Sequence, residues 1–340
     1  MQRTSLHSSV HTIRVAFADQ HRGVDPHKND YLELLEKYYD VIVTDDNPEY
    51  LIYSVFGTDH LKYDCVRIFY TGECITPNFN ECDYAIGFDR LDFGDRYIRF
   101  PYYLCHGYDK EYLSLKDQKP FTKEDLEKKE GFCSFVVSNC FAQDKRAELF
   151  EKIGEYKPVA SGGRYKNNIG GAVKDKLVFT SKYKFAIACE NSCYAGYTTE
   201  KIVDAFAGRA IPIYYGDPTA AEDFNPKAFI NCADYDSFDA VLERVKEIDE
   251  NDDLYLSMIN EPPVRNWLNP DAFEKYLCYI IDQEYDKAFR RPSSMYTRAN
   301  DAMIQRHQFF EKYIYRYYKM GKNQLTRFLN GTYLTSKRTK

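Results

Sequence analysis

The chain has 340 residues, enough for two modest domains or one large one with a sizeable core. It carries 46 Lys and Arg against 52 Asp and Glu, a net charge of −6, which argues against a nucleic-acid-binding protein. Hydrophobic residues make up 44% and charged residues 29%, as in a globular protein, and no apolar run approaches the length of about 18 residues typical of a membrane span.

The first part of the chain alternates strand-like runs with a helical pattern. Runs rich in β-branched and aromatic residues predict strands at residues 11–19, 40–44, 50–56, 66–70 and 84–88. Between the first two, Leu32, Leu35 and Tyr39 recur at helical spacing and predict a helix over residues 30–39. Such alternation is typical of a parallel sheet with helices on both faces.

A polar, lysine-rich stretch between Cys105 and Gly131 is the best linker candidate, and the pattern restarts after it. Strands are predicted at residues 132–138, 184–189, 211–215 and 229–232, and helices at residues 143–156, 237–249 and 271–285. The simplest architecture is α/β, with two Rossmann-like doubly wound domains facing across a cleft and ligands at the carboxyl ends of the strands. One long α/β sheet is the alternative.

We expect domains over residues 1–125 and 126–290, followed by a C-terminal helical tail over residues 291–340. The tail is basic: residues 306–340 hold nine Lys or Arg and one acid, a net charge of +8 that leaves −14 on the rest. Aromatic residues alternate with cations over residues 307–327. Such a helix either adsorbs to an anionic membrane surface or packs back on the body of the protein.

The common catalytic signatures are missing, including the P-loop, the dinucleotide fingerprint, the zinc-protease motif and the nucleophile elbow. No histidine lies between His106 and His307, so chemistry in that stretch must use carboxylates, lysines, hydroxyls or backbone. The ten cysteines contain no C-x-x-C pair, and the chain opens without an apolar signal core. Both observations favour reduced thiols in a cytoplasmic protein.

The most informative stretch is residues 184–218. A strand leads through a polar loop to Thr198 and Thr199, one of which is expected to cap a helix whose N-terminus favours a phosphate. Lys201 in the first helical turn needs a negative partner, either a pyrophosphate or an ordinary partner such as Glu200. Glu200 itself suits either the helix dipole or two vicinal ribose hydroxyls.

Upstream, residues 160–171 (ASGGRYKNNIGG) hold four glycines with Arg164 and Lys166. Glycines let the backbone approach a ligand closely, and the two cations supply positive charge, although an exposed basic turn has the same composition. Together with the helix N-terminus, this loop suits a diphosphate-linked ligand. A nucleotide-sugar needs its leaving diphosphate neutralised, which lysines, arginines and helix N-termini do without a metal.

Residues 185–216 follow the pattern F-x4-E-N-S-x3-G-Y-x-T-E-K-I-x-D-A-F-x4-I-P-I-Y-Y-G, which resembles the signature of the α-1,3-fucosyltransferases, glycosyltransferase family 10. A second block, residues 69–73 with 77–80 and 83–95, is similar to the N-terminal half of bacterial members. Residues 135–139 and 223–226 also match. The resemblance covers roughly residues 60–290.

The resemblance implies a GT-B fold with an N-terminal acceptor domain and a C-terminal domain for GDP-fucose. It implies inverting transfer of L-fucose from GDP-β-L-fucose to the 3-hydroxyl of GlcNAc or Glc in lactose or N-acetyllactosamine-type glycans, giving Lewis X or 3-fucosyllactose type products. Inversion requires one displacement and one base. No cofactor is implied beyond this co-substrate, manganese stimulation stays open, and the protein is expected in the cytoplasm or on the inner membrane surface through its tail.

Carried over by position, the resemblance makes Glu73 the catalytic base, in a Tyr-Thr-Gly-Glu turn just beyond a strand. Three nearby acids are its rivals: Asp89, Asp92 and Asp95.

The same resemblance makes Glu200 the ribose-binding acid and Lys201 the pyrophosphate-binding lysine, with Asn191 and Tyr197 as further donor contacts. Bacterial relatives tend to carry arginine where the alignment places Lys166. Either Lys166 acts there as a point charge or Arg164 takes the role.

Overall fold

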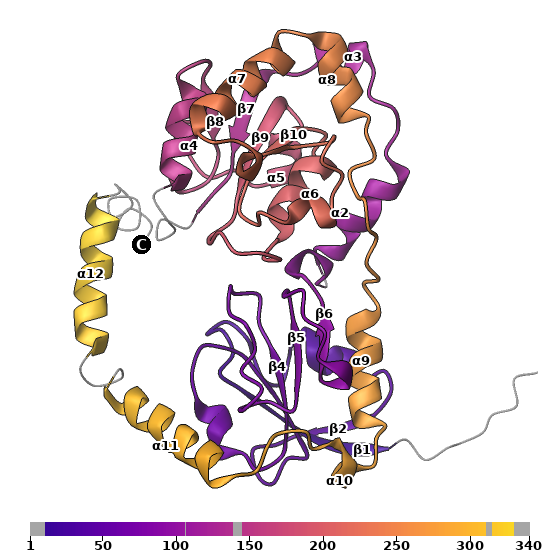
Figure 1. The fold of residues 1–340 in the computed structure, drawn as a ribbon, viewed down its shortest axis with the longest axis vertical. Helices are drawn as coiled ribbons and strands as arrows, with labels where there is room; N and C mark the ends of the chain where they lie inside the picture. The colour runs from indigo at the N-terminus through magenta and orange to yellow at the C-terminus, as the bar shows by residue number, and fades with distance from the viewer. Residues whose placement is uncertain (1–10, 106, 139–144, 311–314, 330–340) are drawn as a thin grey trace, which may run out of the picture. The chain divides into compact units, whose positions relative to one another are not determined.

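The computed structural model describes residues 11–105, 107–138, 145–310 and 315–329. The chain divides into two compact units, which are traced in Figure 1. The first contains residues 1–100 and 270–316, and the second contains residues 101–269 and 317–340.

The first unit is built on a six-stranded sheet in the order β2-β1-β3-β4-β5-β6. Every neighbouring pair is parallel, which confirms the prediction for this part of the chain. The strands are β1 Thr12–Ala18, β2 Asp40–Val43, β3 Tyr50–Tyr53, β4 Val66–Tyr70, β5 Tyr84–Gly87 and β6 Tyr97–Arg99.

Helices from both ends of the sequence complete this unit: α1 (Asp30–Leu35), α9 (Ala272–Ile281) and α10 (Tyr285–Ala288). The α9 residue Phe273 packs its ring 5.8 Å from that of Tyr31 and 5.2 Å from that of Tyr70. Because α9 buries its apolar side here, residues 270–290 belong with the first sheet, whereas the sequence placed them with the second.

The second unit has a five-stranded sheet in the order β11-β10-β9-β7-β8, also parallel throughout. Its strands are β7 Gly131–Phe135, β8 Val159–Ser161, β9 Tyr183–Cys189, β10 Ile211–Tyr215 and β11 Ile230–Asn231. Two parallel sheets in separate units confirm the expected α/β architecture and rule out the single long sheet.

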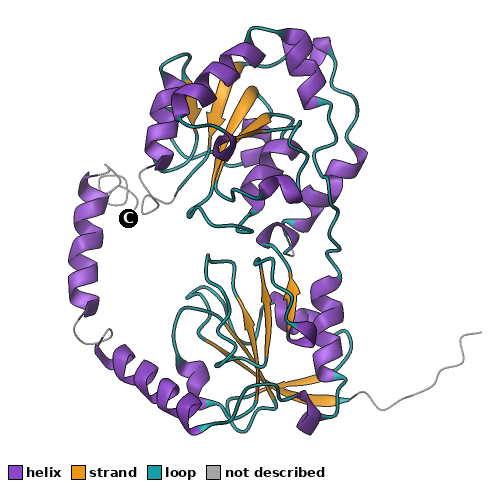
Figure 2. Ribbon diagram, in the orientation of Figure 1, coloured by secondary structure: helices purple, strands orange, loops and turns teal. Residues whose placement is uncertain are grey.

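Large and small residues alternate along β9 and separate the two faces of this sheet. Phe185, Ile187 and Cys189 join the main core with α4 (Lys145–Gly154), α7 (Phe238–Asp249) and α8 (Asp252–Ile259). On the opposite face, Ala186 lets α6 (Glu200–Ala207) approach closely, with α5 (Lys176–Thr180) beside it. Figure 2 shows these helices around the strands of the sheet.

The lysine-rich stretch predicted as a linker contains α2 (Asp109–Ser114) and α3 (Lys123–Glu127), and it belongs to the second unit. The Gln118 side chain donates to the carbonyl of Phe206 at 2.8 Å, and the Phe121 amide donates to Asn260 Oδ1 at 2.7 Å. These bonds explain why the observed boundary follows Phe100 instead of falling near residue 125.

Short 3-10 turns connect several elements: η1 Asp59–Lys62, η2 Gly94–Arg96, η3 Tyr102–Leu104, η4 Leu115–Asp117, η5 Ala220–Glu222 and η6 Cys232–Asp234.

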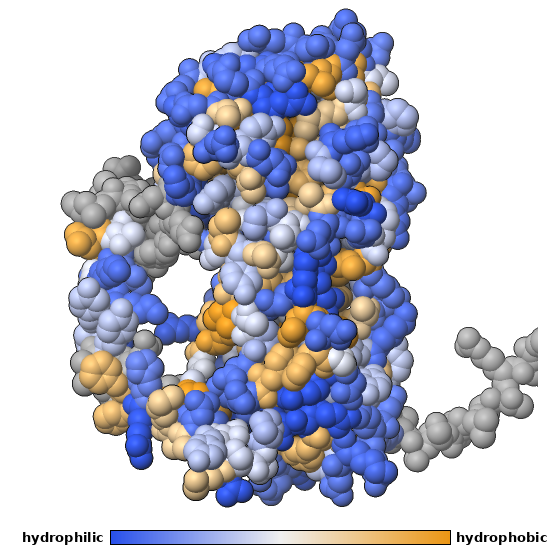
Figure 3. Space-filling model, in the orientation of Figure 1, coloured by the Kyte–Doolittle hydropathy of each residue, from blue (hydrophilic) through white to orange (hydrophobic). Residues whose placement is uncertain are grey.

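The C-terminal segment forms α11 (Met295–Phe310) and α12 (Arg316–Leu329), in agreement with the predicted helical tail. Wherever the structure describes a side chain of these helices, it is exposed or partly exposed. Figure 3 shows hydrophobic residues interspersed with hydrophilic ones along the visible surface of this segment. Within the described ranges, no helix is long and apolar enough to cross a membrane. Part of the predicted basic tail, residues 311–314 and 330–340, lies outside those ranges.

Candidate functional site

The carboxyl edge of the second sheet brings together the ends of several elements. β9 ends at Cys189 and is followed by Glu190 and Asn191, while α5 and α6 begin nearby at Lys176 and Glu200. Ligands of parallel α/β sheets bind at this edge, where helix N-termini converge.

A protein carboxylate occupies the position beside the α6 N-terminus where the sequence predicted a phosphate. Glu190 is 2% exposed, and its Oε1 accepts the Thr199 amide at 2.8 Å. Its Oε2 accepts the Thr199 hydroxyl at 2.7 Å and the Lys201 ammonium at 3.0 Å. A side chain at Gly216 would clash with Glu190 Cγ, so this glycine makes room for the carboxylate.

Thr199 occupies the N-cap position of α6, but its hydroxyl makes no capping bond to the helix and donates to Glu190 instead. The neighbouring Thr198 donates its hydroxyl to the buried Asp217 at 3.0 Å. The predicted location of the cap is therefore confirmed at Thr199, while the role of its side chain differs.

Lys201 has an internal negative partner in the first helical turn. Besides Glu190, its Nζ bonds to the Thr199 hydroxyl at 2.8 Å and lies 3.7 Å from Glu200 Oε1. Burial alone would lower the pKa of Lys201, but Glu190 and Glu200 raise it, and the net shift is upward. The lysine is thus held charged, with 17% of its side chain exposed.

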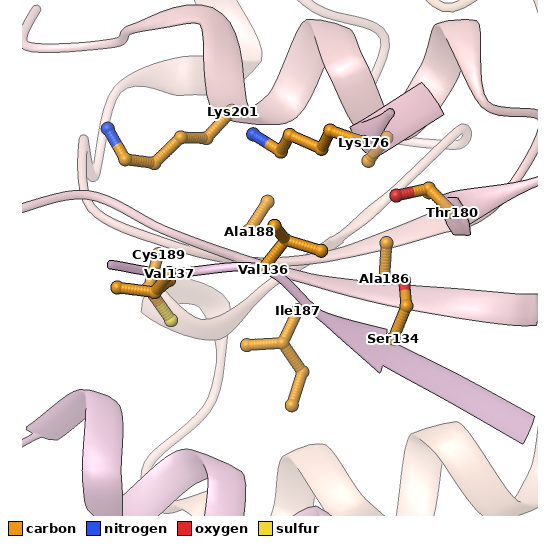
Figure 4. A pocket seen from close by; sticks show the side chains of 11 residues that line it. Ser134, Val136, Val137, Lys176, Thr180, Ala186, Ile187, Ala188, Cys189 and Lys201 are labelled. Atoms are coloured by element: carbon orange, nitrogen blue, oxygen red, sulfur yellow. The ribbon is translucent and has the colours of Figure 1, made fainter. Parts of the chain in front are cut away.

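A second lysine, Lys176 of α5, lies close to Lys201. Figure 4 shows the two side chains in a row, extended in the same direction over β7 and β9 and lining a small pocket with Thr180 and Ser134. The pocket volume of about 20 Å³ is enough for one water molecule. Lys176 Nζ bonds to Asp204 Oδ2 at 2.6 Å. No sequence pattern pointed to Lys176, because α5, the helix that positions it, has only five residues.

Glu200 is held as a carboxylate. Burial alone would raise its pKa, but Lys201 and Lys176 lower it, and the net shift is downward. Burial and then the charge of Glu200 raise the pKa of Tyr108, a sign that this tyrosine lies near the carboxylate.

Arg146 is a buried cation of this edge that sequence reasoning missed. It lies on α4 with 3% exposure, and its Nη1 donates to Asn191 Oδ1 at 3.3 Å. The sequence predicts a helix over residues 143–156, but a helical pattern does not show that an arginine within it is buried. Tyr197, predicted as a donor contact, is buried in the loop before α6.

The glycine-rich loop is held by its own side chains. A Cβ at Gly163 would clash with the backbone of Val137, so the loop packs directly against the end of β7. Asn167 donates to the carbonyls of Gly163 and Gly171, and Asn168 donates to the carbonyl of Val159. The loop is therefore a folded turn with a fixed course.

The two cations of this loop have different surroundings. Lys166 adopts a left-handed backbone with φ of 49°, and its Nζ bonds to Glu151 Oε1 of α4 at 2.6 Å. The Arg164 side chain is exposed, and its amide donates to Ser138 Oγ at 3.5 Å. A ligand phosphate would compete with Glu151 for Lys166, whereas the structure shows no acidic partner for Arg164 among the residues it describes.

Glu73 lies in the first unit, three residues beyond β4. Its side chain is exposed, and its amide donates to the Thr71 hydroxyl at 3.1 Å. The amide of Ile75 donates to the Glu73 carbonyl at 2.8 Å, which closes the turn. The turn thus presents a solvent-accessible carboxylate beyond the carboxyl end of a central strand.

The three rival acids differ from Glu73 in their surroundings. Asp95 binds Arg290 Nη2 at 2.8 Å, and this arginine lowers the pKa of Asp95. Asp92 is exposed and accepts the Gly94 amide at 3.2 Å. Asp89 is buried, which raises its pKa. Only Asp92 shares the exposure of Glu73 without an ion pair among the described residues.

No group of three or more His, Cys, Asp or Glu side chains is arranged to hold a metal ion in the part of the chain that the structure describes.

Parallel sheets in two compact units, with cations and helix N-termini at the carboxyl edge of the second, match the two-domain GT-B class of glycosyltransferases, as do the solved structures described below. The profile of the alpha-(1,3)-fucosyltransferase FucT N-terminal domain matches residues 15–106. That of the glycosyltransferase family 10 (fucosyltransferase) C-terminal region matches residues 126–261. The chain belongs to glycosyltransferase family 10, the fucosyltransferase family.

Individual relatives agree with this assignment. The chain is 37% identical over 278 residues to alpha-(1,3)-fucosyltransferase FucT of Helicobacter pylori, an alignment that covers 72% of this chain. It spans 57% of the length of that relative.

Solved structures show the same fold. A crystal structure of an alpha1,3-fucosyltransferase superposes with a TM-score of 0.69 at 30% identity, covering 84% of this chain and 94% of the other. A crystal structure of an alpha1,3-fucosyltransferase with GDP-fucose superposes with a TM-score of 0.67 at 27% identity, covering 86% of this chain and 96% of the other.

Proposed function

We propose that the protein transfers L-fucose, with inversion, from GDP-β-L-fucose to the 3-hydroxyl of GlcNAc or Glc in lactose or N-acetyllactosamine-type acceptors. The observation that carries the proposal is the charged Lys201, held by buried Glu190 beside the N-terminus of α6. A leaving diphosphate requires such a preorganised positive site as the glycosidic bond breaks. The similarity to a structure with bound GDP-fucose supports this donor.

The second unit is the proposed donor domain. Lys201 and Arg146 would neutralise the diphosphate, because both are cations held in place by neighbouring side chains. Glu200, kept ionised, would accept hydrogen bonds from the ribose hydroxyls. Asn191 would contact the donor beside Arg146.

Three further donor contacts carry over from the sequence with weaker structural support. Tyr197 is buried, so it would contact the donor only after the loop before α6 rearranges. Of the two loop cations, Lys166 pairs with Glu151 and would meet a phosphate beside this acid, as Lys201 would beside Glu190. Exposed Arg164 has no acidic partner among the described residues. We therefore retain both and favour Arg164 on this ground.

The first unit is the proposed acceptor domain, with Glu73 as the base that removes the proton of the acceptor hydroxyl. Its exposure leaves the carboxylate open to an acceptor, unlike that of Asp89. A single displacement with one base gives inversion, so no covalent intermediate is needed. We propose no required cofactor.

A peripheral contact of the basic tail with a membrane surface is part of the proposal. Exposed Tyr317, Tyr318 and Leu325 with Arg316 and Lys319 supply the apolar and cationic groups that adsorption needs. Co-sedimentation with vesicles that contain anionic lipid, compared with neutral vesicles, tests it. Failure of the protein to sediment with either kind of vesicle would contradict this contact.

The decisive experiment mixes the protein with GDP-fucose and either lactose or N-acetyllactosamine and identifies the product linkage by NMR. We expect GDP release and an α-1,3-linked fucose. UDP-galactose and GDP-mannose serve as alternative donors, and Lys201→Met serves as the inactive control. Absence of a fucosylated product with either acceptor, or transfer from another donor only, would contradict the proposal.

A further inference from the structure

The turn that carries Glu73 lies beside a second acid at the end of the neighbouring strand. β4 and β5 pair with Ile68 opposite Tyr84 and Tyr70 opposite Ile86. Glu73 and Asp89 are separated in sequence by the same number of residues as each of these pairs. Both residues therefore lie just beyond the same carboxyl edge of the sheet.

Asp89 is fixed in this place by contacts on both its side chain and its backbone. Its Oδ1 accepts the Thr76 hydroxyl at 3.0 Å, and its carbonyl accepts the Tyr97 hydroxyl at 2.8 Å. The Tyr97 ring packs against Gly87, where a Cβ would lie 3.1 Å from the phenol oxygen.

The carboxyl group of Asp89 is costly to bury in this way. The residue is 7% exposed, and its Oδ2 has no hydrogen-bond partner among the described residues. Burial raises the pKa of Asp89, against the opposing effects of Thr76 and Arg99. A buried polar group of this kind calls for an explanation, which can be strain, a bound water or a role in the active site.

Thr76 connects this acid to the Glu73 turn. The turn is fixed on one side by Thr71, whose hydroxyl accepts the Glu73 amide, and on the other by the Thr76–Asp89 bond. Glu73 lies between these two fixed points with its carboxylate exposed. The two bonds restrict the backbone that carries Glu73 while leaving its side chain accessible.

We propose that Thr76 and Asp89 are positioning residues, which hold the turn so that the Glu73 carboxylate meets the acceptor hydroxyl. The inference rests on the proposed function, in which Glu73 is the base. A displacement of a reacting group by about 1 Å can cost on the order of 100-fold in rate. Loss of the Thr76–Asp89 bond should therefore lower kcat rather than donor binding.

The test compares Thr76→Val, which removes the hydroxyl and keeps the shape, with Thr76→Ser, which keeps the hydroxyl. Thr76 is exposed, so both variants should fold. Thr12→Val is the matched control, because Thr12 donates to Asp40 Oδ2 at 3.0 Å at the amino end of the same sheet. We expect Thr76→Val to lower kcat by about tenfold or more with an unchanged KM for GDP-fucose. Thr76→Ser and Thr12→Val should retain the wild-type kcat.

A double variant shows whether Thr76 acts through Glu73. In a Glu73→Gln background, Thr76→Val should cause no further loss, because the group that it positions is already gone. Wild-type kcat in Thr76→Val, or an equal further loss in the double variant, would overturn this inference and leave the proposed function intact. Full activity of Glu73→Gln alone would overturn the role of Glu73 and the positioning role together.

Discussion

The carboxylate of Glu190, buried at the end of β9, holds the ammonium of Lys201 at 3.0 Å across the loop that leads into α6. The pair explains how a lysine is stable in the first turn of a helix, where the dipole disfavours a cation. It also means that part of the positive charge at this edge is already matched by an internal acid.

Removing Lys201 should separate stability from donor binding. Lys201→Met leaves Glu190 buried without its cation, so we expect a loss of about 3 kcal/mol in the free energy of unfolding. Adding Glu190→Gln should restore most of this stability, because the neutral amide no longer needs the cation. GDP binding, measured by calorimetry, should stay weak in both variants.

Two outcomes would contradict this account. Unchanged thermal stability of Lys201→Met would show that the pair does not matter to the fold. Wild-type affinity for GDP in the stable double variant would remove Lys201 from the proposed diphosphate site.

Glu73→Gln should abolish most activity without affecting the fold. The side chain is exposed, so its neutralisation should leave the melting temperature unchanged. Loss of a general base lowers the rate by about 10²- to 10⁴-fold, and we expect the decrease in kcat with a similar KM for GDP-fucose. Asp92→Asn is the matched control, since Asp92 is a second exposed acid beyond the neighbouring strand. A similar loss in both variants would not support a specific role for Glu73.

The strands were predictable because their signals are local. β4 was predicted at its observed bounds, as was β10, since both are continuous runs of β-branched and aromatic residues. β6 and β8 were missed because three residues are too few to show a period. α2 was missed because its polar sequence buries only Tyr112.

The parts of the site that were missed depend on contacts distant in sequence. The prediction placed a negative ligand beside Lys201, and the sequence could not show that Glu190 folds back to fill this position. The prediction that placed residues 270–290 in the second domain was wrong for the same reason. The Tyr39 hydroxyl donates to Asp282 Oδ1 at 2.8 Å, a contact between segments that no local pattern connects. Strand ends and helix starts locate a site, whereas the pairing of its charges depends on the tertiary structure.

His60 should make the first unit more stable in acid than in base. Its Nδ1 lies 2.7 Å from Asp19 Oδ2 and its Nε2 lies 3.0 Å from Glu81 Oε2. Burial alone would lower the pKa of His60, but these two carboxylates raise it, and the net shift is upward. The stabilisation is therefore complete below the unfolded pKa of about 6.5 and is lost as the pH rises through the higher folded pKa.

The measurement compares melting temperatures of the wild type and His60→Gln across neutral to alkaline pH. We expect a large difference at low pH that shrinks as the pH rises. His21→Gln is the control, since His21 is exposed and should show a constant, small difference. A gap between His60→Gln and the wild type that does not change with pH would contradict a charged His60.

Asp83 should anchor the segment that leads into α11. Its fully buried carboxylate accepts the amides of Arg290 and Arg291 at 2.8 Å each on Oδ1. Its Oδ2 accepts the Arg67 amide at 2.8 Å and lies 3.1 Å from Nε of Arg291. One side chain thus ties β4 to a segment more than 200 residues away in sequence.

Asp83→Asn places an amide group, with donors of its own, among these donors and removes the charge that Arg291 needs. Breaking a buried ion pair of this kind costs about 3 to 5 kcal/mol, so we expect a clear loss of stability in urea. Hydrogen exchange should accelerate at the amides of Arg290 and Arg291 before the rest of the unit, because their acceptor is weakened. Asp64→Asn, at an exposed acid close in sequence, should change neither quantity. If the two variants behave alike, then apolar packing of α9 and not Asp83 holds the C-terminal segment on the first unit.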